Sequence, residues 1–183
     1  MVSYYEAEVL EKFELVIDAQ ALALLHSRDY RSFIPLILAK TKIHLSHLTL
    51  VEFLAYLYYS KKTDAKLDAL SFLKQLYDVV ELDDNIIKRA ALMESDLLHH
   101  SIIPDATDLL NSSIAVERGY MLVSSEPSRY EEYKKYGLMV ISFSELIEAV
   151  KEFLIKESGV VKVPEILSST SIMYRNEQCL SLG

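Results

Sequence analysis

The sequence predicts an α/β fold, a three-layer α/β/α sandwich around a five-stranded, mainly parallel sheet. Five short apolar segments rich in valine, isoleucine, leucine and tyrosine recur along the chain, and segments with helical spacing lie between them. Strands and helices that alternate in this way form a parallel sheet covered by helices on both faces. Gly119 and Gly137 each come directly before an apolar segment, where glycine typically ends a helix in the left-handed conformation.

Each expected element follows from its local pattern. The strands are expected at residues 13–17, 42–46, 78–82, 120–124 and 138–142. Helices between and after them are indicated by apolar residues at helical spacing, namely Leu67, Leu70, Leu73 and Leu76, then Ile86, Ile87, Ala90 and Ala91, then Leu146, Val150, Phe153 and Leu154. Parallel sheets of this class place their ligand sites at the carboxyl ends of the strands. We therefore expect functional side chains directly after strands.

The chain of 183 residues has the length of one domain. We expect this domain over residues 1–156, with residues 1–12 as an extension before the first strand. The helical periodicity fades after Lys156, so residues 157–183 are interpreted as a C-terminal extension of unknown role. Charged residues make up 25% and apolar residues 51% of the chain, as is usual for globular proteins.

Charge and cysteine content argue against several classes of protein and exclude two kinds of cysteine site. A net charge of -8 argues against sequence-blind coating of nucleic acid, but a nuclease remains compatible because a metal ion can supply local positive charge. Glu6, Glu8, Glu11 and Glu14 stand where a secretory signal would be basic, and no run reaches membrane-spanning length. We expect a cytoplasmic protein without a membrane partner. Cys179 is the sole cysteine, which excludes an internal disulfide and a cysteine-built zinc site.

Asp18 is the one charged residue in the apolar segment LVIDAQALALL, residues 15–25. An ionised carboxylate in such a segment is costly unless something pairs with it. Because Asp18 follows the first predicted strand, its side chain is expected at the carboxyl edge of the sheet. One interpretation is a ligand site, and the other is the N-cap of the helix that begins at Ala19.

Glu52 is likewise the one charged residue in LTLVEFLAYLYY. It is a candidate site residue, but Thr49 and Glu52 also have the spacing of a capping box, and the two roles can coexist. Apolar residues surround this helix, so we expect Tyr56, Tyr58 and Tyr59 to lie in the core and in a subunit interface of a homodimer.

Three further acids stand near predicted strand and helix ends. Asp105 and Asp108 open a helix, and Asp105 is the better N-cap because it follows Pro104. Asp108 then lies in the first turn, where backbone amides favour a carboxylate. Glu126 follows the fourth strand, in the place that Asp18 holds after the first.

Asp18, Glu52, Asp108 and Glu126 are therefore expected near one edge of one sheet. Unneutralised carboxylates held together repel one another, and their pKa values rise. Mg²⁺ or Mn²⁺ would neutralise them, because these hard ions bind carboxylate oxygens and retain several waters.

The acids belong to four short motifs in a fixed order. This order, over about residues 13–142, resembles the PIN-domain nucleases, which include the toxins of VapBC-type toxin–antitoxin pairs. The motifs are VIDAQALALL with Asp18, LTLVEFL with Glu52, DLLNSSIA opening at Asp108, and LVSSEP, in which Ser124 stands two places before Glu126.

Spacing supports the resemblance, and three positions depart from it. The 18-residue step from Asp108 to Glu126 is similar to the family spacing and favours Asp108 over Asp105. Ala19 and Gln20 replace the usual threonine and asparagine, and Glu126 replaces the usual aspartate. These changes are the basis of the alternative interpretation as a weak or inactive module.

The resemblance implies a Mg²⁺- or Mn²⁺-dependent endoribonuclease that leaves a 5′-phosphate, with an antitoxin as a possible protein partner. Asp18, Asp108 and Glu126 would hold the ion, and Glu52 would hold water at the ion or orient a ligand. Asp105 and Ser124 would be auxiliary residues. The alternative is a weak or inactive PIN-like module that binds RNA or a protein partner.

Phosphotransfer on a similar sheet fits less well. Phosphatases of the haloacid-dehalogenase type need a second aspartate two residues after the first, and Gln20 occupies that place. Receiver domains need paired acids after the first strand, where only Asp18 stands. The chain also has no glycine-rich phosphate loop.

Overall fold

A five-stranded parallel sheet forms the centre of the protein. The computed structural model describes residues 10, 12–60 and 68–158. The strands are β1 (Leu15–Ile17), β2 (Ile43–Leu45), β3 (Asp78–Val79), β4 (Met121–Ser124) and β5 (Met139–Ser142). Their order across the sheet is β3-β2-β1-β4-β5, and every neighbouring pair is parallel. All five predicted strands are confirmed, each shorter than its apolar segment.

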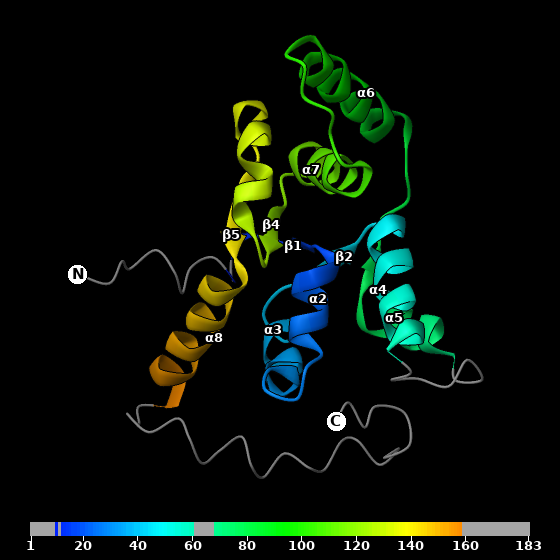
Figure 1. The fold of residues 1–183 in the computed structure, drawn as a ribbon. Helices are drawn as coiled ribbons and strands as arrows, with labels where there is room; N and C mark the ends of the chain where they lie inside the picture. Colours follow the sequence, from blue (N-terminus) through cyan, green and yellow to red (C-terminus); the bar gives the residue numbers. More distant parts are fainter. Residues whose placement is uncertain (1–9, 11, 61–67, 159–183) are drawn as a thin grey trace.

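Helices cover both faces of this sheet, which confirms the predicted sandwich (Figure 1). One layer contains α2, α3, α4, α5 and α8, and the other contains α6, α7 and η2. The helices are α2 (Ala19–Leu25), η1 (Arg31–Phe33), α3 (Ile34–Leu38), α4 (His47–Tyr59), α5 (Ala69–Leu76), α6 (Asp84–His99), α7 (Ala106–Arg118), η2 (Pro127–Tyr136) and α8 (Phe143–Ser158).

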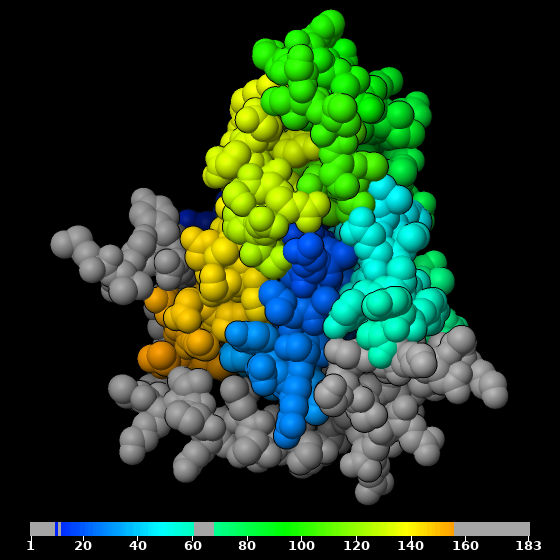
Figure 2. Space-filling view, viewed as in Figure 1, coloured from blue at the N-terminus to red at the C-terminus, as the bar shows by residue number. Residues whose placement is uncertain are grey.

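The helix α4 lies at the surface and corrects one expectation. Its buried side chains are Thr49, Leu50, Phe53 and Leu57. The three tyrosines expected in the core are exposed, with exposed fractions of 43% for Tyr56, 47% for Tyr58 and 90% for Tyr59. Figure 2 shows the cyan side chains of this segment on the outside of the molecule. Apolar composition predicted burial here, but only one stripe of α4 faces the sheet.

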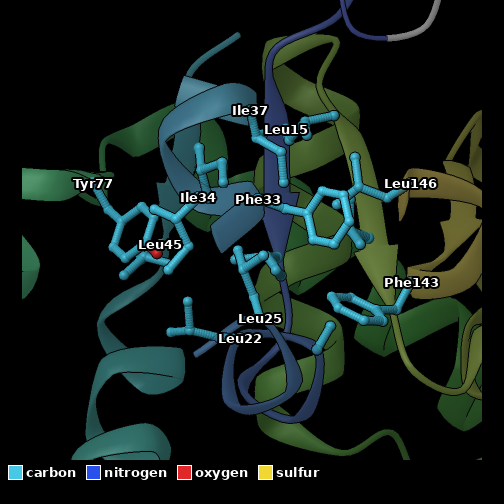
Figure 3. Packing of buried hydrophobic residues seen from close by; sticks show 14 of the residues in the cluster. Leu15, Leu22, Leu25, Phe33, Ile34, Ile37, Leu45, Tyr77, Phe143 and Leu146 are labelled. Atoms are coloured by element: carbon cyan, nitrogen blue, oxygen red, sulfur yellow. The ribbon is translucent and has the colours of Figure 1, made fainter. Parts of the chain in front are cut away.

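The core is divided by the central strand β1. Side chains of a strand point alternately to opposite faces. Leu15 and Ile17 therefore pack with the α2, α3 and α8 layer, whereas Val16 packs with α6 and α7. Figure 3 shows Leu15 among Ile34, Ile37 and other members of the first cluster. Because both faces are covered, all three residues of β1 are fully buried.

The helix ends match the glycine pattern. Gly119 ends α7 with φ of +69°, and Gly137 ends η2, a 3-10 helix, with φ of +92°. The predicted helical segments at residues 86–91 and 146–154 lie in α6 and α8, and Leu70 to Leu76 lie in α5. Leu67 lies outside the described residues.

The two extensions are described only in part. Leu10, in the expected N-terminal extension, is buried against the first core cluster. The helix α8 continues to Ser158, slightly past the expected domain boundary at residue 156. Cys179 and the rest of residues 159–183 lie outside the described residues. No helix in the described part of the chain has the length and apolar character needed to cross a membrane.

A buried histidine follows α2. The Nε2 atom of His26 lies 2.8 Å from the Tyr77 hydroxyl, and its ring packs against Phe53. Burial lowers the pKa of His26 from 6.5 to about 4. The folded protein therefore holds this ring neutral at pH values where the unfolded chain protonates it.

We predict that His26 makes the fold acid-sensitive. As the pH falls from 6.5 toward 4, the unfolded chain gains a proton at His26 that the folded chain does not, so the free energy of unfolding decreases. The slope of the free energy of unfolding against pH reports the difference in bound protons between the two states. His26→Gln should reduce this slope by about one proton, because glutamine stays neutral and can still accept from Tyr77. Urea unfolding at several pH values between 4.5 and 7.5 measures the free energy of unfolding and so this slope. His99→Gln, at an exposed position of α6, is the matched control, and equal slopes in wild type and His26→Gln would contradict the assignment.

Candidate metal centre

Asp18 lies at the junction of β1 and α2. Its backbone N–H donates to the Val123 carbonyl at 3.1 Å, which continues the pairing of β1 with β4. Its Oδ1 accepts from the Ala21 N–H at 2.7 Å, so the N-cap interpretation is confirmed. The residue is only 4% exposed, and Oδ2 has no hydrogen-bond partner among the described residues. Burial raises the pKa of Asp18, and the nearby Ser124, Ala21 and Arg129 oppose this shift. A bound ligand would explain a buried carboxylate oxygen that has no partner of this kind.

Asp108 lies in the first turn of α7, as predicted. Asp105 is the N-cap of this helix, because its Oδ1 accepts from the N–H groups of Thr107 at 2.9 Å and Asp108 at 3.1 Å. The Asp108 side chain is buried, and burial raises its pKa. Arg129 opposes this rise, and the nearby charge of Asp105 adds to it.

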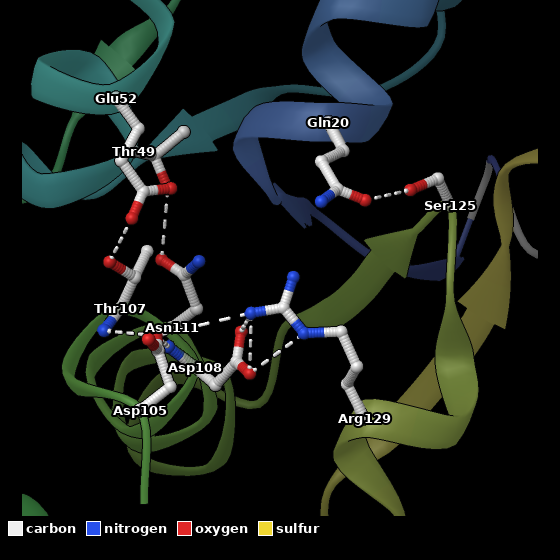
Figure 4. Close-up of polar contacts among 9 residues, drawn as sticks. All are labelled: Gln20, Thr49, Glu52, Asp105, Thr107, Asp108, Asn111, Ser125 and Arg129. Atoms are coloured by element: carbon white, nitrogen blue, oxygen red, sulfur yellow. Dashed lines mark hydrogen bonds and ion pairs between the residues drawn. The ribbon is translucent and has the colours of Figure 1, made fainter.

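The Arg129 guanidinium binds the Asp108 carboxylate through two nitrogen atoms. Its Nε donates to Oδ2 at 3.0 Å and its Nη2 donates to Oδ1 at 2.9 Å (Figure 4). No role for Arg129 was expected from the sequence. A signal was nevertheless present, because Arg129 is the one basic residue between Arg118 and Lys134, in the segment that follows β4.

Glu52 joins α4 to α7 and does not form the expected capping box. The cap of α4 is Ser46, whose hydroxyl accepts from the Thr49 N–H at 3.1 Å. Thr49 therefore lies inside the helix, and its hydroxyl donates to Asn111 Oδ1 at 3.2 Å. Glu52 is exposed and accepts from the Thr107 hydroxyl at 2.5 Å. These two contacts fix α4 beside the start of α7 (Figure 4).

Ser124 and Glu126 lie at the end of β4. The buried Ser124 hydroxyl accepts from the Glu126 N–H at 2.9 Å, whereas the Glu126 side chain is exposed. Gln20, one of the departures from the resemblance, accepts from the Ser125 hydroxyl at 3.0 Å. This contact ties the segment after β4 to the first turn of α2.

Three buried polar atoms in this region lack a hydrogen-bond partner among the described residues. They are Asp18 Oδ2, Asn111 Nδ2 and the Tyr130 hydroxyl. Burial raises the pKa of Tyr130 far above its ordinary value, and the charges of Asp18 and Asp108 raise it further. Asp108 and Asn111 lie next to the Tyr130 hydroxyl and can pair with it. Because buried polar groups are rarely left unpaired, Asp18 Oδ2 is the atom here that indicates a ligand site.

The structure brings the predicted acids together only in part. Asp18 and Asp108 share Arg129 and Tyr130 as neighbours. Glu52 is held at the adjoining contact of α4 with α7, and Glu126 is exposed at the end of β4. Within residues 10, 12–60 and 68–158, no group of three or more His, Cys, Asp or Glu is placed to hold a metal ion together. Asp18 and Asp108 fit a hard divalent cation through the unpartnered oxygen of Asp18.

Known proteins of this architecture resemble the chain over most of its length. A VapC ribonuclease of Pyrococcus furiosus is 29% identical over 145 residues, which cover 79% of this chain and 95% of the relative. A chain of VapBC-1 from nontypeable Haemophilus influenzae superposes with a TM-score of 0.59, at 13% identity, over 71% of this chain and 98% of the other. This chain has the fold of the PIN-domain VapC proteins.

Another solved structure has the same fold. It is a chain of VapBC2 from Rickettsia felis, crystallised with a DNA fragment from the promoter, with a TM-score of 0.56 and 17% identity over 70% of this chain and 97% of that one. No family model matches the sequence.

We predict that the cap and the charge of Asp18 can be separated. Asp18→Asn keeps an oxygen for the Ala21 N–H, because asparagine caps helices as well as aspartate does. Asp18→Ala loses that cap and should be about 1 kcal/mol less stable than Asp18→Asn. Since burial disfavours the charged carboxylate, Asp18→Asn should be at least as stable as wild type at pH 7. Urea unfolding of the three proteins measures this, and equal stability of the two variants would show that the cap contributes nothing.

Proposed function

We propose that this PIN domain is a divalent-metal-dependent endoribonuclease and the toxin of a toxin–antitoxin pair. The observation that carries the proposal is the unpartnered Asp18 Oδ2 at the end of β1, on a residue that shares Arg129 and Tyr130 as neighbours with the buried Asp108. The ribonuclease name of the Pyrococcus relative supports the reaction class. The VapBC assemblies among the solved relatives support an antitoxin as protein partner.

The proposed ion is Mg²⁺ or Mn²⁺. Asp18 and Asp108 would hold it, and the exposed Glu126 would complete the site from the end of β4. When bound, such an ion lowers the pKa of water and offsets negative charge on a phosphodiester.

The remaining residues have supporting roles in this proposal. Asp105 holds the first turn of α7 and so orients Asp108, and Ser124 holds the backbone of Glu126. Glu52 would orient a ligand from α4, where its contact with Thr107 keeps it next to the start of α7. The backbone contacts of Asp18 fix its carboxylate at the edge of the sheet.

A homodimer is part of the proposal. The exposed apolar side chains of α4 include Val51, Tyr58 and Tyr59, with exposed fractions of 62%, 47% and 90%. A surface of this kind is typical of a contact between subunits.

A second candidate function is a weak or inactive module that binds RNA or a protein. Two observations favour it. Arg129 already pairs with Asp108, and Gln20 is engaged with Ser125 in place of the usual asparagine. Titration calorimetry with Mn²⁺ distinguishes the candidates, because absence of binding at millimolar Mn²⁺ would favour the module.

We predict that Asp18→Asn loses Mg²⁺-dependent RNA cleavage by about 100-fold or more while the fold stays intact. The reason is that asparagine retains the cap but not the anionic oxygen. Cleavage of a labelled RNA with and without EDTA measures the activity. The matched control is Asp83→Asn, the same substitution at the N-cap of α6. Wild-type cleavage by Asp18→Asn would refute the assignment of Asp18.

A further inference from the structure

The Arg129–Asp108 pair has an unequal exposure that bears on the proposed metal site. The Asp108 side chain is 8% exposed, whereas that of Arg129 is 32% exposed. Arg129 is therefore the more solvent-accessible partner of the pair. Figure 4 shows it reaching across from η2 to the first turn of α7. A cation that reaches the Asp108 carboxylate finds this group already bound to it.

The Arg129–Asp108 pair also occupies the two carboxylate oxygens that a cation would bind. Each Asp108 oxygen accepts one guanidinium N–H, which is the two-pronged arrangement that matches arginine to a carboxylate. A divalent ion placed on the same oxygens would lie next to a permanent positive charge. At such distances in a partly buried site, like charges repel strongly.

Arg129 has another carboxylate within reach. Its Nη2 lies 4.0 Å from Asp105 Oδ1, and the Asp105 side chain is 56% exposed. A shift of the guanidinium toward Asp105 would release Asp108 and keep the arginine beside an acid. Asp105 itself stays in place, because its bonds to Thr107 and Asp108 hold it as the helix cap.

We propose that Arg129 is a built-in competitor of the divalent cation for Asp108, so that the cation binds only when the guanidinium leaves this carboxylate. Without the ion, Arg129 neutralises the buried acid and stabilises the pocket. With the ion, Asp108 exchanges one positive partner for another. This inference rests on the proposed function, because it takes Asp18 and Asp108 as the cation ligands.

Arg129→Met tests the competition, since methionine retains an unbranched apolar stem and removes the charge. The apparent Mn²⁺ affinity should rise about tenfold in titration calorimetry, while the metal-free protein should become less stable to heat. Arg118→Met is the matched control, because Arg118 pairs with Asp83 at the far end of α7 and its loss changes the net charge equally. It should leave Mn²⁺ affinity unchanged.

Arg129→Lys provides a second variant if Arg129→Met does not fold. Lysine keeps a charge for Asp108 but cannot bind both oxygens in the same planar fork, so Mn²⁺ affinity should again exceed that of wild type. Affinity equal to or below wild type in the folded variant would overturn the competition and leave the proposed function standing. Absence of Mn²⁺ binding by wild type and by the Arg129 variants alike would overturn the proposed function, and the competition with it.

Discussion

The pairing of buried carboxylates with positive charge is the constraint on which the site depends. Asp18 and Asp108 are almost fully buried, and burial raises the pKa of both. Helix N-termini offset part of the cost of burying these charged carboxylates, because Asp18 caps α2 and Asp108 lies in the first turn of α7. Arg129 supplies the rest for Asp108, whereas one oxygen of Asp18 remains without a partner among the described residues.

The topology explains why these groups meet. The strand β1 is central, with β2 on one side and β4 on the other, so the chain order reverses at β1. Ligand sites of parallel α/β sheets lie at such a reversal, beyond the carboxyl ends of the strands. Asp18 follows β1, and Ser124 and Glu126 lie at the end of β4. The helix α7 then brings Asp108 to the same edge, and α4 adds Glu52 through Thr107.

Local signals were readable from the sequence. The five strands, the left-handed Gly119 and the caps Asp18 and Asp105 each follow from a few neighbouring residues, and all are confirmed. The capping box at Thr49 was wrong, because Ser46 caps the helix three residues earlier and the Thr49 hydroxyl turns to Asn111.

Contacts between distant segments were harder to predict. Glu52 contacts Thr107, which lies 55 residues further along the chain. Arg129 contacts Asp108, and the strand β4 lies between these two residues in the sequence. Neither pairing is indicated by neighbouring residues in the sequence. The prediction of several buried acids at one edge of the sheet did, however, leave open whether a basic side chain pairs with one of them. The exposed tyrosines of α4 show a similar limit, because composition alone does not say which face of a helix meets the sheet.

A crystal soaked in Mn²⁺ and measured at a wavelength where manganese scatters anomalously tests the central claim most directly. We expect an anomalous peak in contact with Asp18 Oδ2 and Asp108, with the Arg129 guanidinium displaced from the Asp108 carboxylate. A map with no peak at these oxygens, and with Arg129 still paired to Asp108, would contradict it.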